Sequence, residues 1–548
     1  MRSSKSEFRL GYGLAAVLLS LAACTAGGGS GTVPATPVRG GTLTYAIDTA
    51  PLCLDPHVST EDMTAEVQRN VLDSLVYEDA SGAFHPWLAT SWSIAKDLKS
   101  YTFELRRDVT FTDGTPFDAE AVKANFDHIT AKNTKSQYAV NLLGPYRETE
   151  VLDRYRVRVS FTRPFAPFLQ AASTSYLGIY SPRTLKDNAD KLCGGGSASV
   201  GTGPFTEVRY VKGQSIEFVR NPKYNWPPEP AKHRGPAYLE RVNFRILREN
   251  STRVGALTSG QVDVARALPP AQMRTVEAGR TVKILRRDAP GGIYGLYLNT
   301  TNGPLTDERV RVAVQRGINI DQDVRTVYFG QYKRAWSPLS PSTPGYDARL
   351  AGSWPYDPAM AGSLLDQAGW TGRDQAGFRT KAGRRLTLEW PALPSGDARE
   401  NREMLAQAVQ ADLKKIGVQV IRPRYDVGAY STKVNAGRFG ILDFSWARFE
   451  PDLLRSFFNS ASGPPSGQNA SFLKDGEVDR WTDDAAATVD RATRNALYAK
   501  TQEKVIKLGA AVPLYVPTAL TGVGPHAHGV TLDPNNWLLF YDAWRDGK

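Results

Sequence analysis

Alternation of apolar and polar residues predicts strands in the N-terminal half of the chain. Residues 41–47, 101–105 and 154–161 each place an apolar side chain at about every second position, as in a strand with one buried face. Residues 63–75 instead carry apolar side chains four positions apart, which is the spacing of a helix. Asp118 follows a turn rich in Gly and Pro. It is expected to cap a second helix, because its side chain can accept from a free N–H of the first turn.

The C-terminal half alternates predicted helices and strands. Asp357 and Pro358 mark a helix start, because Asp caps the first turn and Pro fits the first helical position. The apolar stripe that follows stops at Gly369. A second stripe over 405–416 stops at Gly417 and leads into a short predicted strand. This order of elements favours α/β domains with largely parallel sheets.

The N-terminus has the layout of a secretory signal. Three basic residues within the first nine positions precede an apolar stretch over 10–21, and small residues follow. That stretch is too short for a comfortable transmembrane helix, so we assign residues 1–23 to a signal peptide. After residue 25 no apolar stretch approaches the roughly 20 residues that are needed to span a bilayer.

Cys24 directly follows Leu21-Ala22-Ala23, a sequence that resembles a bacterial lipobox. In such signals the cysteine sulfur receives a diacylglyceryl group and becomes the first residue after cleavage. The alternative is an ordinary signal peptide with a chance cysteine. Two or more acyl chains would anchor the protein stably to a membrane. Residues 24–38 are rich in Gly, Ser, Thr and Pro and are expected to form a flexible tether.

The three cysteines fit an exported protein. If Cys24 carries lipid, Cys53 and Cys193 remain, and an even remainder in an oxidising compartment predicts a disulfide between them. The alternative is two separately buried thiols.

Length and charge narrow the possible functions. A chain of 548 residues is too long for one compact core, so at least two domains are expected. The net charge of +11 is basic, but Arg and Lys are scattered, and no basic run with interleaved aromatic residues points to nucleic-acid binding.

No catalytic set stands out in the sequence. The chain has only six histidines, no local Cys–His cluster with metal-ligand spacing and no Gly-x-Ser-x-Gly motif. His526 and His528 are too few ligands for a metal site. We therefore expect no enzyme activity, no cofactor and no metal. A lipid-anchored secreted hydrolase and a lipoprotein that senses or docks partners without transport remain the alternative functions.

A series of short motifs runs in order along the chain. They are Leu54-Asp55-Pro56, PWLATSW at 86–92, YTFELR at 101–106, FTDGTPF at 111–117, GTGPF at 201–205, RNPKY at 220–224, LTSGQVD at 257–263, Asn299 and DERVRVA at 307–313. From about residue 40 to the C-terminus the chain thereby resembles the family 5 extracellular solute-binding proteins. This family contains the oligopeptide- and dipeptide-binding proteins of ABC importers.

The resemblance implies an α/β fold of the type II periplasmic-binding-protein class, a clamshell of two lobes with mixed sheets and an extra α+β subdomain on lobe I. The chain is expected to cross between the lobes near Asn299 and near Pro513. The implied segments are 39–75, 186–293 and 510–548 for lobe I, 76–185 for the extra subdomain and 294–509 for lobe II.

The resemblance also indicates which residues line the ligand cleft. They are Thr60, Glu61, Met63, Tyr138, Tyr294, Asp443, Trp446, Arg448 and Tyr515. In peptide-binding relatives a carboxylate shortly after a Trp holds the α-amine of the peptide, whereas here Arg448 and Phe449 occupy that place. Asp443 could substitute, since it shares a strand face with Ser445. The alternatives are that Trp446 and the tyrosines pack the core and that Arg448 is a surface charge.

The expected protein is a monomeric substrate-binding lipoprotein on the outer face of the cell membrane. It would capture a peptide or another small organic solute and deliver it to the permease subunits of an ABC importer. Peptides come first by family frequency, and oligosaccharides, opines and metal chelates remain open. Because Arg448 would repel an ammonium group, we expect weak binding of free-amine peptides.

Overall fold

A computed structural model describes residues 36–394, 400–465 and 467–547. From residue 38 onward the described residues form one compact unit. The predicted signal peptide, Cys24 and most of the tether lie outside the described residues. In the described part of the chain, no helix has both the length and the apolar character needed to cross a membrane.

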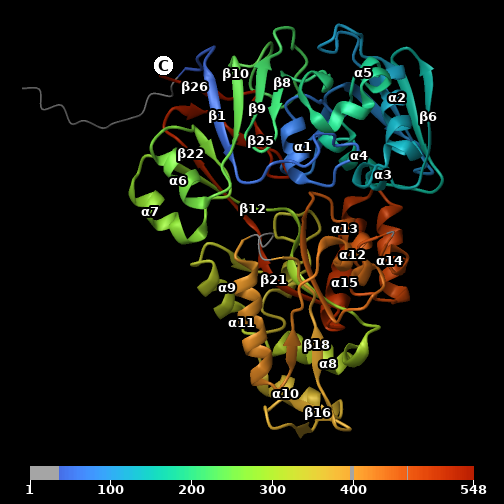
Figure 1. The fold of residues 1–548 in the computed structure, drawn as a ribbon. Coiled ribbons are helices and arrows are strands. Elements are labelled where there is room, and N and C mark those ends of the chain that lie inside the picture. Colours follow the sequence, from blue (N-terminus) through green and yellow to red (C-terminus); the bar gives the residue numbers. More distant parts are fainter. Residues whose placement is uncertain (1–35, 395–399, 466, 548) are drawn as a thin grey trace, which may run out of the picture. The chain divides into compact units, whose positions relative to one another are not determined.

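A seven-stranded mixed sheet collects strands from three distant parts of the chain (Figure 1). We call the part built on this sheet lobe I. β1 is parallel to its neighbours β10 and β11, and the other pairings are antiparallel. In sheet order the strands are β12 (Lys283–Asp288), β22 (Thr518–Val523), β11 (Val264–Ala265), β1 (Thr42–Ile47), β10 (Arg241–Ile246), β9 (Ser215–Arg220) and β8 (Phe205–Val211).

The subdomain consists of a four-stranded antiparallel sheet with helices on it and an aromatic-rich core. Asp118 caps α2 (Ala119–Thr130) as predicted, because its side chain accepts from the N–H of Ala121 at 3.3 Å. A short hairpin of β2 (Val76–Glu78) and β3 (Phe84–Pro86) precedes this sheet. The further elements are β4 (Ala89–Ile94), β5 (Ser100–Leu105), β6 (Tyr146–Asp153), β7 (Arg156–Phe161), α2 (Ala119–Thr130), α3 (Tyr138–Leu143), α4 (Phe168–Ala171) and α5 (Pro182–Asp187).

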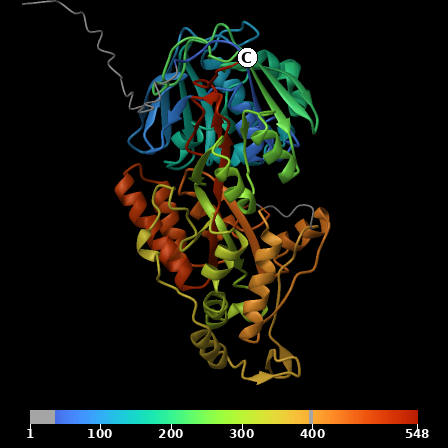
Figure 2. The ribbon, with the colours of Figure 1, turned by 90° about the vertical axis from the view of Figure 1, so that its left-hand side faces the viewer.

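Lobe II is built on a four-stranded antiparallel sheet (Figure 2). Every residue of its strand β13 (Gly291–Leu298) is buried. In sheet order its strands are β14 (Lys333–Arg334), β21 (Ala511–Val516), β13 (Gly291–Leu298) and β20 (Ile441–Ala447). Lobe II also contains a smaller pair of parallel strands, β18 (Thr387–Glu389) and β19 (Gln419–Ile421), which are connected by α11 (Arg402–Lys415). The predicted cap at Asp357 is present, since its side chain accepts from the N–H of Met360 at 2.8 Å.

The remaining elements complete the two lobes. In lobe I they are α1 (Asp62–Gln68), α6 (Asn250–Thr258), α7 (Met273–Ala278), β23 (Ala527–His528), β24 (Thr531–Leu532), β25 (Leu538–Leu539) and β26 (Trp544–Arg545). In lobe II they are α8 (Glu308–Arg316), α9 (Ile320–Val327), α10 (Pro358–Gln367), β15 (Gly372–Arg373), β16 (Arg379–Lys381), β17 (Arg384–Arg385), β18 (Thr387–Glu389), α11 (Arg402–Lys415), β19 (Gln419–Ile421), α12 (Val427–Asn435), α13 (Leu453–Phe458), α14 (Gly476–Ala486) and α15 (Arg491–Lys507).

Two expectations about regular structure were wrong. The sheets are not largely parallel, because the main sheet of lobe II and the subdomain sheet are antiparallel throughout. The helix expected over 63–75 ends at Gln68. Beyond it the Asn70 side chain donates to the carbonyls of Glu66 and Val67, and the backbone at Gly203 packs against Val71. This tertiary contact overrides the continuing apolar spacing.

The predicted crossings between the lobes also need correction. Pro513 lies inside β21 and Asn299 follows directly on β13, so both belong to lobe II. Asn299 is fixed there, because its side-chain amide donates to the carbonyl of Gly437 at 3.0 Å. The chain instead crosses between β12 and β13 and between β21 and β22. The N–H of Ala289 donates to the carbonyl of Pro517 at 2.7 Å, so the two crossings are hydrogen-bonded to each other.

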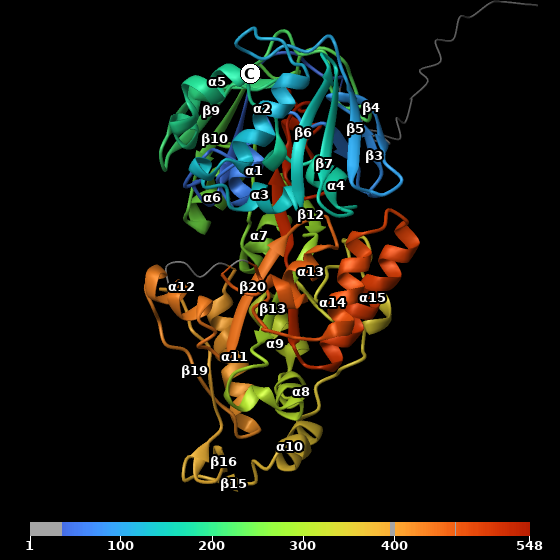
Figure 3. The same cartoon turned by 90° about the vertical axis from the view of Figure 1, so that its right-hand side faces the viewer.

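The subdomain also contacts lobe II away from the crossings (Figure 3). The N–H of Ala166 donates to the carbonyl of Ala486 at 2.8 Å. The Arg491 guanidinium donates to the carbonyl of Ser81, in the turn between β2 and β3, at 2.7 Å. These contacts join the subdomain to α14 and α15.

Candidate ligand-binding site

Trp446 on β20 meets an aromatic residue of the subdomain. Its ring centroid lies 4.9 Å from that of Tyr138 on α3 and 6.0 Å from that of Phe457 on α13. Tyr138 in turn packs edge-on against Tyr176 at 4.5 Å. Trp446 is only partly buried and touches the hydrophobic clusters of both the subdomain and lobe II. It therefore stands where the subdomain meets lobe II.

Arg448 lies just beyond the end of β20 and is buried, with 7% of its surface exposed. Its Nε has no hydrogen-bond partner, and no ion pair of its guanidinium is recorded in the described part of the chain. Burial raises the pKa of Tyr138 to about 12, and the positive charge of Arg448 acts in the opposite direction. The guanidinium is therefore a buried cation, close to Tyr138, that forms no ion pair within the part of the chain that the structure describes. Such a charge is costly unless an anion neutralises it.

The segment after Arg448 is fixed by polar contacts to both lobes. The N–H of Phe449 donates to Oδ1 of Asn535, in the C-terminal part of lobe I, at 3.1 Å. Glu450 pairs with Arg494 on α15 at 2.6 Å. Because Glu450 already has a cation, it is not a free carboxylate for a ligand amine.

Asp443 points to the other face of β20 from Trp446. Its two oxygens accept from the hydroxyl of Tyr294 and from Nε1 of Trp390, each at 2.5 Å. Both contacts lie within lobe II. Tyr294 and Trp390 thus satisfy much of the hydrogen-bonding capacity of Asp443, the carboxylate that the sequence offered as one possible substitute for the amine-binding group.

Arg402 is a neighbour of the site that sequence reasoning missed. It donates to Oγ of Ser445 at 2.9 Å and to the hydroxyl of Tyr515 at 3.2 Å, and it pairs with Glu400 at 3.0 Å. Its guanidinium carbon lies 4.3 Å from the ring centroid of Tyr294. No sequence signal identified Arg402, because the apolar stripe of α11 starts only at Leu405.

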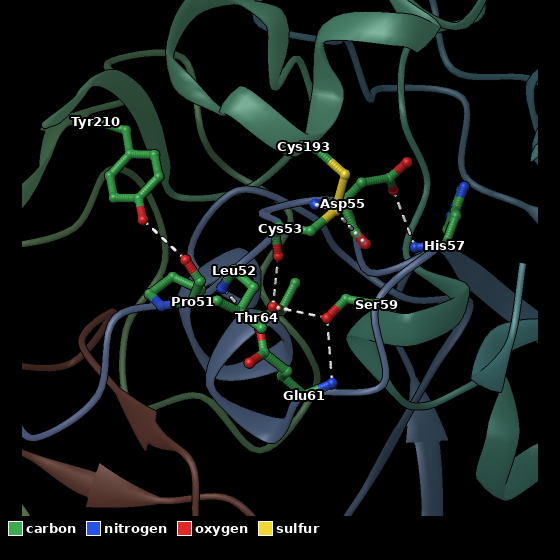
Figure 4. Close-up of a disulfide and its surroundings, with 10 residues drawn as sticks. All are labelled: Pro51, Leu52, Cys53, Asp55, His57, Ser59, Glu61, Thr64, Cys193 and Tyr210. Atoms are coloured by element: carbon green, nitrogen blue, oxygen red, sulfur yellow. Dashed lines mark hydrogen bonds between the residues drawn. A yellow bond between two sulfur atoms is a disulfide. The ribbon is translucent and has the colours of Figure 1, made fainter. Parts of the chain in front are cut away.

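A disulfide joins Cys53 to Cys193 across a sequence separation of 140, which is the pairing that the cysteine count predicts (Figure 4). The backbone supports the same junction, because the N–H of Leu54 donates to the carbonyl of Cys193 at 3.0 Å. Oγ1 of Thr64, in α1, donates to the carbonyl of Cys53 at 2.6 Å. The turn that leads into α1 is therefore attached to both the helix and the segment around Cys193.

The predicted contacts at 60–63 lie at the start of α1. Thr60 is exposed, and Oε2 of Glu61 accepts from the N–H of Leu52 at 2.8 Å. Met63 is buried, with 7% of its surface exposed. Asp62 connects this segment to the aromatic cluster, since its Oδ1 accepts from the hydroxyl of Tyr176 at 3.3 Å.

The predicted site residues therefore fall into two sets and a connected segment. One set is Tyr138, Trp446 and Arg448, and the other is Tyr294, Asp443 and Tyr515. The segment that holds Thr60, Glu61 and Met63 reaches the first set through Asp62 and Tyr176. Among the described residues, no cluster of three or more His, Cys, Asp or Glu is arranged to hold a metal ion.

Comparison with known proteins decides the family. The family model described as bacterial extracellular solute-binding proteins, family 5 Middle, matches residues 83–468. The chain belongs to this family. A curated relative, the nickel-binding periplasmic protein of Escherichia coli, is 27% identical over 463 residues, which cover 83% of this chain and 85% of that protein. The glutathione-binding protein GsiB of Pectobacterium atrosepticum is 27% identical over 500 residues, 89% of this chain and 91% of that one.

A solved structure gives the same result for the fold. NikA from Brucella suis, in complex with Fe(III)-EDTA, is similar with a TM-score of 0.81 and 25% identity over 92% of this chain and all of that one. This family 5 protein therefore has the type II periplasmic-binding-protein fold. Its relatives and fold neighbours are solute-binding proteins that act outside the cytoplasm, not enzymes.

Proposed function

We propose that this family 5 protein captures a small organic solute that carries a carboxylate or another anionic group, and delivers it to the permease of an ABC importer. Arg448 is the observation on which the proposal rests. Its guanidinium is buried and has no ion pair among the described residues, beside the partly exposed ring of Trp446. A ligand anion would supply the missing charge, and the aromatic rings of Trp446 and Tyr138 would contact its apolar part.

The edge position of β20 supports an extended ligand. In the order β14-β21-β13-β20 this strand has a neighbour on one side only. An extended chain can add hydrogen bonds to such an edge, while side chains at the strand end set specificity. Glutathione, named for one relative, is peptide-like and carries two carboxylates against one free amine. Its net negative charge, which simple free-amine peptides lack, makes it a suitable first candidate.

The ligand should be identified from native protein. Mass spectrometry of whatever is released on denaturation is expected to find an anionic or N-blocked solute. Calorimetry with the purified ligand would then measure its affinity. Recovery of simple free-amine peptides alone would contradict the proposed selectivity.

Ligand binding is expected to close the two lobes by a rigid-body hinge. The two crossings, joined by the Ala289–Pro517 hydrogen bond, form a narrow connection that can act as a hinge. A ligand held by both lobes favours the closed state by its differential affinity. Small-angle scattering should show a smaller radius of gyration at saturation. The Arg448→Ala variant at the same ligand concentration serves as the control, and no change in the parent protein would contradict the mechanism.

We also propose that Cys24 carries the lipid that anchors the protein to the outer face of the membrane. The lipobox-like Leu21-Ala22-Ala23-Cys24 sequence supports this. The Cys24→Ala variant should appear in the soluble fraction or remain unprocessed, whereas Cys53→Ala should stay with the membrane. Unchanged membrane partitioning and an unchanged N-terminal mass for Cys24→Ala would contradict the assignment.

A further inference from the structure

One end of lobe I carries a group of exposed basic side chains. They belong to residues 38–41, which lead into β1, and to residues 220–241, which connect β9 to β10. Hydrogen bonds hold these segments together, since the N–H of Gly40 donates to the carbonyl of Tyr238 at 2.8 Å and the N–H of Arg220 to that of Glu240 at 2.9 Å. We call these two segments the tether end of lobe I. Its exposed cations are Arg39, Lys223, Lys232, Arg234 and Arg241.

The protein itself does little to neutralise these five charges. None of the five side chains forms an ion pair within the described ranges, and Arg39 donates only to a carbonyl, that of Pro236, at 3.3 Å. Glu240 is exposed and offsets one charge. The other carboxylates close to this end already have partners, which are His85 for Glu229 at 3.4 Å, His233 for Asp542 at 2.9 Å and Arg106 for Asp108 at 2.8 Å. The tether end is therefore a basic surface.

The chain enters lobe I at this same end. β1 begins at Thr42, which lies opposite Arg241 in the register of β1 and β10. Fully extended, the residues between Cys24 and Val38 span at most about 50 Å, at roughly 3.3–3.6 Å per residue. A lipid on Cys24 would thus keep the bilayer within reach of the five cations.

The candidate solute site lies toward the opposite end of the lobe I sheet. The crossings to lobe II follow Asp288, at the end of β12, and precede Thr518, at the start of β22, and these two residues pair with each other. β12, β11 and β1 run in the same direction, because β22 is antiparallel to both β12 and β11 (Figure 1). The crossings are therefore at the end where β1 finishes, and the tether is at the end where it starts. Contact of the tether end with a surface leaves the solute site accessible.

We propose that the tether end of lobe I binds the anionic headgroups of the bilayer that holds the lipid, so that the solute site faces away from the membrane. This inference rests on the proposed lipid at Cys24 and does not depend on the identity of the solute. Anionic lipids attract basic segments that lie close to the membrane, and a basic surface adds to the anchoring by acyl chains. A soluble polyanion would match the charge but not the tether, which leads to a bilayer.

Vesicle binding by the chain without its lipid tests the charge of this surface. The chain from residue 25 onward contains the whole compact unit, and it would be sedimented with vesicles of phosphatidylcholine, with or without an equal part of phosphatidylglycerol. Binding to the anionic vesicles is expected to be at least about tenfold tighter at low salt and to be lost at high salt, because salt screens exposed charges. Equal binding to both kinds of vesicle would overturn the proposal. So would polyglutamate that binds as tightly, charge for charge, since the partner would then be any polyanion.

Two variants with the same loss of charge locate the contact. In the first, the five cations of the tether end are replaced by Gln, and binding to the anionic vesicles should weaken at least about tenfold. In the second, five exposed cations of lobe II that form no ion pair among the described residues are replaced by Gln, and binding should change less than about twofold. These control positions are Arg325, Arg384, Lys414, Arg438 and Lys500. An equal loss in both variants would assign the binding to the net charge of the protein and overturn the proposal.

The full lipidated protein separates this inference from the lipid assignment. On anionic vesicles, hydrogen exchange should slow in peptides of residues 220–241 and stay unchanged in the β16–β17 hairpin. An N-terminal mass without acyl chains would contradict the lipid at Cys24, whereas vesicle binding by the chain from residue 25 onward would still support a basic contact surface. An acylated protein with unchanged exchange in residues 220–241 would overturn the contact and leave the lipid assignment intact.

Discussion

Replacing Arg448 with Ala is expected to weaken the binding of a carboxylate ligand by two to three orders of magnitude. The guanidinium is buried, so the ligand anion would lose its counter-ion in a poorly hydrated site. Leaving one charge of a buried pair alone costs about 3–5 kcal/mol, and roughly 1.4 kcal/mol corresponds to a factor of ten in affinity. Calorimetry with glutathione or the co-purified solute measures the effect.

A matched ligand pair separates charge from shape. An N-acetylated dipeptide and its C-terminal amide differ chiefly in one negative charge. The parent protein should prefer the acid, and Arg448→Ala should bind the two about equally. Arg384→Ala removes an exposed arginine of the β16–β17 hairpin and should change neither affinity. Submicromolar binding of unmodified free-amine peptides, with Arg448→Ala having no effect, would show that the segment after β20 does not select for anions.

Motifs and local patterns predicted the family, the fold class and several helix ends. Asp118 and Asp357 cap helices as expected, because capping depends only on residues within one turn. The disulfide partners follow from counting, because only two cysteines remain if Cys24 carries lipid. Helix caps and a cysteine count can be predicted without knowing which distant segments of the chain are in contact.

Features that depend on distant contacts could not be predicted. The position of the crossings depends on how far β13 and β21 pair with each other, and this pairing extends beyond the predicted boundary at residue 509. The early end of α1 results from packing of Gly203 against Val71. Neither contact leaves a trace in the local hydrophobic pattern.

In the candidate site, too, the sequence identified individual residues but not the distant contacts between them. Tyr138 and Trp446 were chosen separately by resemblance, and only the structure places their rings 4.9 Å apart. Arg402 went unnoticed, because a single arginine before a helix is far more often a surface charge than a neighbour of a binding site. Its contacts with Ser445 and Tyr515 join residues more than forty positions apart in the sequence.

Removing the Cys53–Cys193 disulfide is expected to lower the free energy of unfolding of lobe I by about 2–5 kcal/mol. The bond closes a long loop, with a sequence separation of 140, so its loss increases the conformational freedom of the unfolded chain. The double variant Cys53→Ser/Cys193→Ser avoids free thiols. Hydrogen exchange measured by mass spectrometry should show faster opening of peptides that contain β1 and α1.

A second variant distinguishes loss of the cross-link from a local disturbance of the turn before α1. Thr64→Val removes the hydrogen bond to the carbonyl of Cys53 and leaves the disulfide in place, so it should cost only about 1 kcal/mol. Peptides of β20 and α11 in lobe II should exchange at unchanged rates in both variants, because the disulfide lies wholly within lobe I. If the double-serine variant protects β1 and α1 as well as the parent does, the cross-link does not stabilise this lobe. If Thr64→Val alone matches the loss in the double variant, the hydrogen bonds of the turn, rather than the covalent bond, hold the start of α1 at the candidate site.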